Sequence, residues 1–537
     1  MSTTVDTMLD TLDSADVPES TTWTTGNVAE AFPGVFSTFG ISFVFGPMEL
    51  AFRRMFHDLG ALSSSDVKVP EEVSDCFWSL FAGWGAGNID KFREIANVLP
   101  GTSATAIEQQ LFGYVRPDTV DANTVGRYPA ILAKAPRWVI GVPRRHDAMF
   151  AELRRWRLDR LPRIADLDEA GCLAVLADAR TRFEDIMSIH MGVAFISSAL
   201  ADKVAEAAAA GGFPGLEQHL LSGVGSDENE VAYDLWALAH GTISEQQFVD
   251  RHGYHGPNEG QLHGITWREN LAPIRSRLAD YRAIADDNPR APRHRSAAQR
   301  QLRDDAVQRL LNATPRSRRR ATAWMVRIAG RFLALREQGK AGYLITYDVA
   351  RAAARRLGDL LVERGVITDR EHVFHLRYDA LVAGISGDQS AIVTERIDRF
   401  ARQQGIRVPQ AWAGYPAVTK VDEDDDVALG TGGVVTGVAA SAGQVEGRAR
   451  VVRDPAETEL DDGDILVCET TDPSWVSLFM VAAGVVTDFG GLLSHGPIVA
   501  REIGIPCVCG TESGSRQIRD GQMLRVDGDT GRVTVIG

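Results

Sequence analysis

The pattern of hydrophobic and polar positions divides the chain into four segments and predicts a multidomain protein. Residues 1–25 are rich in Ser, Thr and Asp and contain no long apolar run, which predicts a disordered leader. In residues 26–411 apolar positions recur mostly with helical spacing, which predicts a mainly α-helical domain. Residues 412–433 combine an acidic run with glycines and have no apolar period, which indicates an exposed hinge. Residues 434–537 alternate strand and helix patterns, as a compact α/β domain does.

The stretch from Gly490 to Pro506 (GGLLSHGPIVAREIGIP) places a histidine between a strand and a helix. Residues 483–489 form a β-branched run, and the helical spacing after His495 ends at Gly504. We therefore expect His495 at the N-terminus of a helix. Backbone N–H groups without intrahelical partners and the helix dipole favour an anion there.

An imidazole in this place can act as a nucleophile, and the free amides would hold a phosphoryl group bonded to its nitrogen. The sequence thus predicts a catalytic His495 on a phosphate loop formed by Gly490, Gly491, Ser494 and Gly496. The alternative is that His495 only caps the helix or packs beneath the glycine turn.

The run from Gly490 to Gly510 resembles the signature of the mobile phosphohistidine domain of phosphoenolpyruvate synthase, pyruvate phosphate dikinase and rifamycin phosphotransferase. The resemblance implies that His495 accepts a phosphoryl group from ATP and carries it to a distant acceptor site. Those enzymes usually have threonine where Leu493 stands, which leaves Ser494 as the nearest hydroxyl. The α/β domain also resembles this family at a Thr-x-Pro turn over residues 471–473 and at its start, which contains Gly437, Ser441, Gly443 and Gly447.

A second candidate site is the R-E-x-x-K sequence of Arg336, Glu337 and Lys340, which would share one edge of a predicted helix. Two cations facing the same way repel each other unless an anion lies between them, and a phosphoryl group would supply that anion. Taken alone, the pattern also fits an ordinary exposed helix. The same motif occurs in the same order in the resembling family. The resemblance implies that Arg336 and Lys340 neutralise the transferring group, while Glu337 orients the acceptor or takes its proton.

Residues 248–270 gather titratable side chains on a glycine-rich backbone, as a site on a loop does. The spacing does not match a standard metal motif, so no metal site is predicted. The segment resembles a Gly-x-Arg-x-x-x-Glu loop and a following Arg-Trp stretch that line the acceptor pocket of the family. His255 stands at the arginine position and could serve as a general base, or it could simply hydrogen-bond to its own loop. The predicted substrate-binding residues are His252, His255, Glu259, Trp267 and, from an Asn-x-x-Glu-x-x-Pro-Gly segment that also resembles the family, Asn27.

Composition narrows the classes of partner. A net charge of −15 argues against a general nucleic-acid or membrane-surface role, and no apolar run approaches the roughly 20 residues that span a bilayer. The first residues lack the features of a signal peptide, so a cytoplasmic location is expected. The five cysteines suggest neither a disulfide framework nor a zinc site.

The sequence contains no P-loop, and only a short polar segment precedes the acceptor-like region, which leaves no room there for an ATP-grasp fold. We therefore expect ATP and Mg²⁺ to be bound by a separate ATP-grasp subunit, as in phenylphosphate synthase, whose histidine and nucleotide subunits are distinct chains. The predicted function is a phosphotransferase subunit that carries a phosphoryl group on His495 to the hydroxyl of a small apolar or aromatic acceptor. Phosphorylation could also activate an alcohol for dehydration. The alternative from another class is a ligand-binding or carrier protein on the same scaffold, without catalysis.

Overall fold

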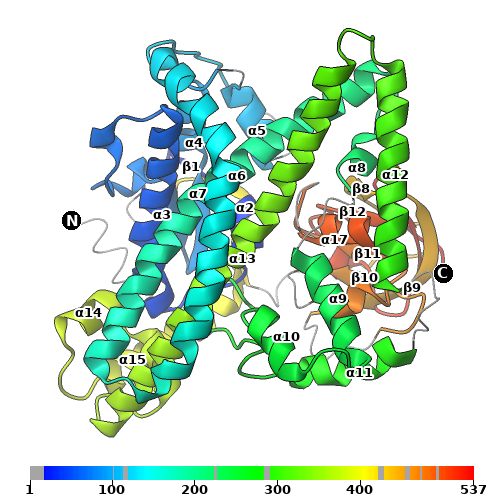
Figure 1. Cartoon of the computed structure of the whole chain (residues 1–537). Helices are drawn as coiled ribbons and strands as arrows, with labels where there is room; N and C mark the ends of the chain where they lie inside the picture. The colour runs from blue at the N-terminus through cyan, green and yellow to red at the C-terminus, as the bar shows by residue number, and fades with distance from the viewer. Residues whose placement is uncertain are drawn as a thin grey trace. The chain divides into compact units, whose positions relative to one another are not determined.

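The computed structural model describes residues 17–100, 102–112, 116, 119–222, 227–283, 291–420, 428–453, 460–471, 475–491 and 495–537. The chain forms two compact units. The first unit consists of Met1–Gly192, Gly260–Gly264 and Gly339–Asp424, and the second of Val193–Glu259, Ile265–Gln338 and Asp425–Gly537. The boundary between the units falls inside two continuous helices, α7 (Glu169–Ala210) and α13 (Arg319–Glu363) (Figure 1).

The first unit is mainly helical, as predicted, and it also contains a small antiparallel sheet with the strand order β2-β3-β1-β5. Local signals set its helix ends. Ser37 caps α3, because its hydroxyl accepts a hydrogen bond from the Gly40 N–H at 3.1 Å, and Gly60 ends α3 in the left-handed conformation at φ 93°. Besides parts of α7 and α13, its elements are β1 (Thr22–Thr24), α2 (Gly26–Ala31), α3 (Thr38–Leu59), β2 (Trp78–Phe81), β3 (Trp84–Asn88), α4 (Ile89–Ala96), α5 (Ala104–Phe112), α6 (Tyr128–Arg160), α14 (Tyr378–Ala383), α15 (Ser390–Gln404), β4 (Ile406–Arg407), β5 (Ala411–Ala413) and β6 (Thr419–Lys420), together with four short 3-10 helices, Ser64–Asp66, Val73–Asp75, Leu161–Asp166 and Arg370–His375.

Pairing between distant strands corrects both ends of the predicted helical domain. The leader prediction for residues 1–25 is wrong at its C-terminal end, because β1 pairs with β3 and β5 and the side chain of Trp23 is fully buried. The hinge prediction for residues 412–433 is wrong at Trp412, which pairs with Trp23 in antiparallel register, and at β6, which pairs with β4. Residues 1–16 and 421–427 lie outside the described residues.

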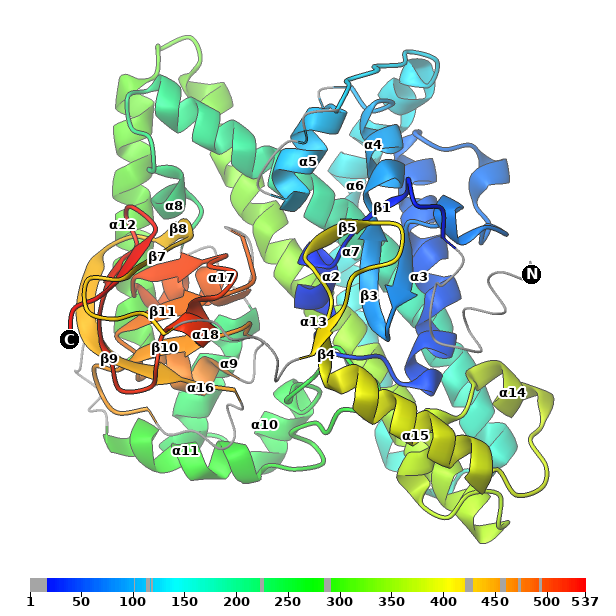
Figure 2. The same cartoon turned by 180° about the vertical axis from the view of Figure 1, so that it is seen from behind.

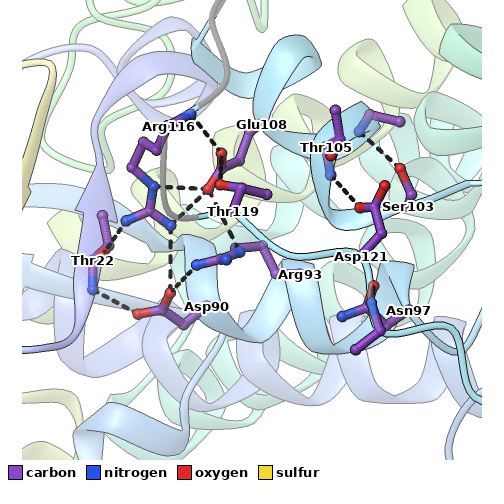
Figure 3. Close-up of polar contacts among 12 residues, drawn as sticks. Thr22, Asp90, Arg93, Asn97, Ser103, Thr105, Glu108, Arg116, Thr119 and Asp121 are labelled. Atoms are coloured by element: carbon purple, nitrogen blue, oxygen red, sulfur yellow. Dashed lines mark hydrogen bonds and ion pairs between the residues drawn. The ribbon is translucent and has the colours of Figure 1, made fainter.

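A buried carboxylate holds α4, α5 and β1 together in the first unit (Figure 3). The Arg116 guanidinium donates to Glu108 at 2.7 Å and to the Thr22 hydroxyl at 2.6 Å. The Thr22 N–H in turn donates to Asp90 at 2.8 Å, and Thr119 donates to Glu108. Burial alone would raise the pKa of Glu108, but the hydrogen bonds from Thr119 and Arg116 lower it. This network is structural, because its donors and acceptors are already matched to one another.

The second unit contains an eight-stranded sheet with the order β7-β14-β13-β9-β10-β11-β12-β8. Figure 2 shows α16, α17 and α18 beside its strands, which are coloured orange to red. The predicted α/β region at the C-terminus is therefore present. The central strands are parallel and buried along their whole length, which explains their continuous apolar runs. The sheet region consists of β7 (Val434–Thr436), β8 (Val438–Ser441), β9 (Gln444–Val451), β10 (Ile465–Cys468), α16 (Val476–Phe479), β11 (Gly484–Thr487), α17 (His495–Ile503), β12 (Cys507–Cys509), α18 (Gly514–Gln517), β13 (Met523–Asp527) and β14 (Arg532–Val535).

One face of this sheet packs against helices from the middle of the chain. Alternate residues of β10 point to opposite faces, so Ile465 and Val467 join one apolar cluster while Leu466 and Cys468 join another. The second cluster also contains Val231 of α9 and Leu278 of α11. Residues 193–259 and 265–338 thus belong to the same compact unit as the C-terminal sheet. The predicted domain boundary at residues 412–433 stays a prediction. These helices are α8 (Glu217–Leu220), α9 (Asp227–Ala239), α10 (Glu245–His252), α11 (Ala272–Ala283) and α12 (Pro292–Ala313), followed by the first part of α13.

Within the ranges given above, no helix has both the length and the apolar character needed to cross a bilayer.

Candidate functional site

His495 is the first residue of α17, as predicted; β11 precedes it in the sequence and Gly504, at φ 79°, follows the helix. The residues that lead directly into the helix, 492–494, lie outside the described residues. The imidazole is only 3% exposed. Its Nδ1 atom lies 3.0 Å from the Thr471 hydroxyl, and the Phe479 ring meets it edge to face at 6.1 Å between centroids. The ring is thus held in one orientation by a neutral hydrogen-bonding partner and an aromatic side chain.

The glycines around the histidine have distinct roles. Gly490 adopts φ 121°, which a residue with a side chain rarely reaches. At Gly496 an added Cβ would lie 3.0 Å from the Thr471 hydroxyl oxygen, so a larger residue would crowd the partner of His495. Gly491 has open space around its Cα, with nothing within 4 Å of an added Cβ. Ser494 lies outside the described residues, so its predicted place in the phosphate loop stays a prediction.

Every residue of α17 is buried, partly because the helix packs against α12. Ile498 joins an apolar cluster with Val326 and Leu333 of α13, one turn before the R-E-x-x-K sequence. The Arg501 guanidinium donates to the Ala440 carbonyl at 3.0 Å. Burial is the largest cause of the lowered pKa of Arg501, and the positive charge of Arg336 acts in the same direction. Arg501, near the C-terminal end of α17, and Arg336 of α13 are therefore electrostatic neighbours.

Arg336, Glu337 and Lys340 all lie on α13, as predicted. Glu337 is 6% exposed, and both cations are partly buried. Arg336 and Glu337 belong to the second unit with His495, and Lys340 belongs to the first. Gly339, within the same sequence, allows a close approach of α7, because an added Cβ would lie 2.5 Å from Nδ1 of His190.

The histidine-rich segment holds two buried histidine–carboxylate pairs. His252 ends α10 rather than lying on the loop, and its Nε2 is 2.8 Å from an oxygen of Asp234. His255 Nδ1 is 2.8 Å from Glu259, and both side chains are nearly inaccessible. Burial alone would raise the pKa of Asp234, but hydrogen bonds from His252 and Arg251 lower it.

Trp267 packs beside the second pair. Its ring centroid lies 5.4 Å from that of His255, and its backbone N–H donates to the His255 carbonyl at 2.7 Å. The predicted substrate-binding residues His252, His255, Glu259 and Trp267 therefore cluster in the second unit. Asn27 lies in α2 of the first unit, where the structure describes its backbone but not its side chain.

Sequence reasoning missed the partners that hold these histidines. Thr471 belongs to the recognised Thr-x-Pro turn, but nothing in the sequence links its hydroxyl to His495, 24 residues later. Asp234 lies on an unremarkable helix, 18 residues before His252. In the part of the chain that the structure describes, the five cysteines are free and buried, and no group of three or more His, Cys, Asp or Glu side chains could hold a metal ion.

Two family profiles match the chain. Residues 460–531 match the mobile domain of PEP-utilising enzymes, and residues 241–337 match the fourth domain of rifampicin phosphotransferase. The two matched regions contain His495 and the histidine-rich segment, respectively, and the second match reaches Arg336 and Glu337.

Curated relatives agree with these matches. A rifampicin phosphotransferase of Streptomyces sviceus is 32% identical over 58% of this chain and 37% of its own length. A rifampicin phosphotransferase of Streptomyces sp. is 35% identical over 54% of this chain and 34% of its own length. One of Bacillus subtilis is 33% identical over 38% of this chain and 24% of its own length. The chain thus spans about a third of the length of the first two relatives and less of the third. A solved structure of Enzyme I aligns with a TM-score of 0.14 at 17% identity over 35% of this chain and 52% of that one, a likeness too weak to use.

The chain therefore carries the mobile domain of the PEP-utilising enzymes together with the fourth domain of rifampicin phosphotransferase, and it is a relative of the rifampicin phosphotransferases.

Proposed function

We propose that this chain is a phosphotransferase component in which His495 carries a phosphoryl group to the hydroxyl of a small apolar or aromatic acceptor. The main support is the setting of His495, an imidazole at a helix N-terminus that is held at Nδ1 by the Thr471 hydroxyl. An ATP-grasp partner that binds ATP and Mg²⁺ would supply the phosphoryl group.

In the first step, Nε2 of the neutral imidazole would attack the phosphorus of the donor. The N–P bond forms while the bond from phosphorus to the leaving phosphate oxygen breaks. Because the Thr471 hydroxyl engages Nδ1, Nε2 is the nitrogen that this geometry assigns to the attack. The N-terminal amides of α17 would stabilise the new negative charge.

In the second step, the acceptor hydroxyl oxygen would attack phosphorus, the N–P bond would break and the imidazole would regain its lone pair. Arg336 and Lys340 would neutralise the phosphoryl oxygens in flight. The hydroxyl proton would pass to Glu337 or to the His255–Glu259 pair, both of which are buried carboxylate-containing groups.

Incubation with labelled ATP and an ATP-grasp partner, or with phosphoramidate as a chemical phosphoryl donor, tests the first step. The expected result is one acid-labile, alkali-stable phosphoryl group per wild-type chain and none on His495→Gln. The matched control is His255→Gln, which keeps the same change of side chain at another buried site and is expected to label normally. Equal labelling of the wild type and His495→Gln would refute the proposal.

A ligand-binding protein without catalysis predicts a different result. In that case the chain would retain a small molecule with an affinity that His495→Gln, Arg336→Gln and Lys340→Gln leave unchanged, and it would not label with either donor.

A further inference from the structure

The turn between α12 and α13, which Figure 1 shows as a helical hairpin, carries a concentration of positive charge that has no part in the proposed phosphoryl transfer. Between Ala306 and Arg331 the sequence contains seven arginines and no aspartate or glutamate, although the chain as a whole has a net charge of −15. Four of the seven, Arg316, Arg318, Arg320 and Arg327, are exposed. We call these four arginines and Trp324 the hairpin patch.

The other three arginines already have structural roles or partners. Arg319 closes the C-terminus of α12, because its guanidinium donates to the carbonyls of Thr314 at 3.0 Å and Asn312 at 3.3 Å. Arg309 lies over the Phe213 ring at 5.0 Å, and Arg331 makes a polar or ring contact of its own. None of the ion pairs found among the described residues involves the four arginines of the hairpin patch.

Trp324 lies on the same face of α13 as two of these arginines. Arg320, Trp324 and Arg327 are separated by four and three residues, which places them on one side of the helix. The indole is 57% exposed, which is unusual for so large an apolar side chain. Trp and Arg are the residue types that contribute most binding energy at protein interfaces.

The hairpin patch is displayed on a fixed support. Ala306 and Leu310 of α12 pack against Val326 and Ala329 of α13 in one buried apolar cluster, and Val204 of α7 joins it. On the exposed side of α7 near this cluster lie Asp202 and Glu206, and Glu206 is already paired with Lys203 at 2.8 Å. The backbone of the hairpin is therefore already ordered, and only the side chains would lose conformational freedom when a partner binds.

We propose that the hairpin patch docks an acidic protein surface, with carboxylates on the four arginines and an apolar side chain against Trp324. Unneutralised arginines on one hairpin repel one another, and a partner's carboxylates would relieve this with bidentate hydrogen bonds. An acidic protein surface can be small enough to contact the hairpin alone. Nucleic acids and anionic membranes are larger anionic surfaces that would also face the rest of the chain, whose net negative charge would repel them. A single exposed indole also offers little apolar area for a membrane.

Fluorescence anisotropy with a short labelled glutamate-rich peptide that contains one leucine tests this proposal on the full chain. We expect the fourfold variant Arg316→Gln, Arg318→Gln, Arg320→Gln and Arg327→Gln to weaken binding by about 10- to 100-fold, since each exposed charge pair makes a modest contribution and four are removed. Trp324→Ala should weaken binding by a few-fold and leave its salt dependence unchanged. Thermal unfolding of each variant checks that it folds.

A matched control changes the net charge equally at another helix: Arg137→Gln, Arg144→Gln, Arg155→Gln and Arg160→Gln on α6, all of which are exposed. The control should bind the peptide as the wild type does. An equal loss of peptide affinity in the control would show that only the net charge of the chain matters, and it would overturn the proposal. So would failure of the wild type to bind the peptide, or tighter binding of an oligothymidylate or of phosphatidylserine vesicles through the same four arginines.

Discussion

Two kinds of buried histidine in the second unit differ in the group that holds them. His495 is held at Nδ1 by the neutral hydroxyl of Thr471, whereas His255 and His252 are held by the carboxylates of Glu259 and Asp234. A carboxylate orients the ring and stabilises the positive charge that develops when the ring accepts a proton. A hydroxyl also orients the ring but adds no charge beside it.

The difference matters because a phosphorylated imidazole carries negative charge. A carboxylate hydrogen-bonded to Nδ1 would repel a phosphoryl group on Nε2 across the ring, in a site shielded from water. A neutral partner orients the ring without this cost. The two settings therefore suit two tasks: His495 a nucleophile, and His255 a base toward the acceptor.

The largest expected effect on phosphoryl labelling comes from replacing the hydroxyl that holds His495 with a carboxylate, the kind of group that holds His255. Thr471→Glu should reduce phosphoryl labelling of His495 on the order of 10³-fold, since two like charges ~4 Å apart repel by about 4 kcal/mol at an intermediate dielectric. The initial rate of labelling from phosphoramidate measures it. Thr471→Ser, which keeps the hydroxyl, is the control, and thermal unfolding checks the fold of both variants. Labelling of Thr471→Glu at the wild-type rate would remove the basis of the comparison.

Changing the carboxylate-held pair should separate the two steps. His255→Asn can still donate to Glu259 but cannot accept a proton, so we expect transfer to the acceptor to fall by roughly 10²-fold, the lower end of the usual contribution of a general base. Labelling of His495 should be unchanged. Single-turnover transfer from the labelled chain to an acceptor alcohol measures the effect. A parallel fall in labelling would mean that His255 supports the fold rather than the acceptor step.

A smaller effect is expected when the hydroxyl is removed without adding charge. Thr471→Val keeps the shape of the side chain and loses a hydrogen bond worth about 1 kcal/mol, so labelling should slow by roughly 5- to 10-fold. The pH dependence of labelling should also move, because Nδ1 of His495 loses its hydrogen-bonding partner. An unchanged rate and pH profile would show that Phe479 and the surrounding packing orient the ring alone.

The smallest effect concerns the second carboxylate-held pair. The pKa of Asp234 is lowered in the folded chain, so its contribution to stability is present above its unfolded pKa near 3.8 and is lost as pH falls further. Asp234→Asn should cost about 1 kcal/mol at neutral pH, after allowance for solvent screening, and this difference should shrink below pH ~4. Urea unfolding across this pH range measures it. A cost that stays constant with pH would show that the charge of Asp234 does not matter.

Local signals in the sequence predicted the parts of the site that depend on neighbours along the chain. The β-branched run, the glycines and the helical spacing placed His495 at the start of α17, and the periodicity around residue 336 placed Arg336, Glu337 and Lys340 on α13. Each of these features is set within a few residues by turn, cap and helix propensities.

Features that depend on contacts between residues far apart in the chain could not be predicted from the sequence. Trp23 pairs with Trp412 across nearly the whole first unit, so neither the leader nor the hinge could be bounded correctly from composition. The packing of α9 and α11 on one face of the C-terminal sheet was hidden for the same reason, since an apolar stripe does not specify which surface covers it.

The close approach of α7 and α13 at Gly339 restricts how the R-E-x-x-K sequence can vary among homologous chains. Even an alanine there would collide with His190, at the 2.5 Å separation between its Cβ and Nδ1 of the imidazole. A chain with a larger residue at this uncharged position should therefore carry a compensating smaller residue at 190. Such covariation would identify homologous chains in which α7 and α13 keep the same spacing. In those chains the residues that correspond to Arg336 and Lys340 should also keep their orientation on the helix.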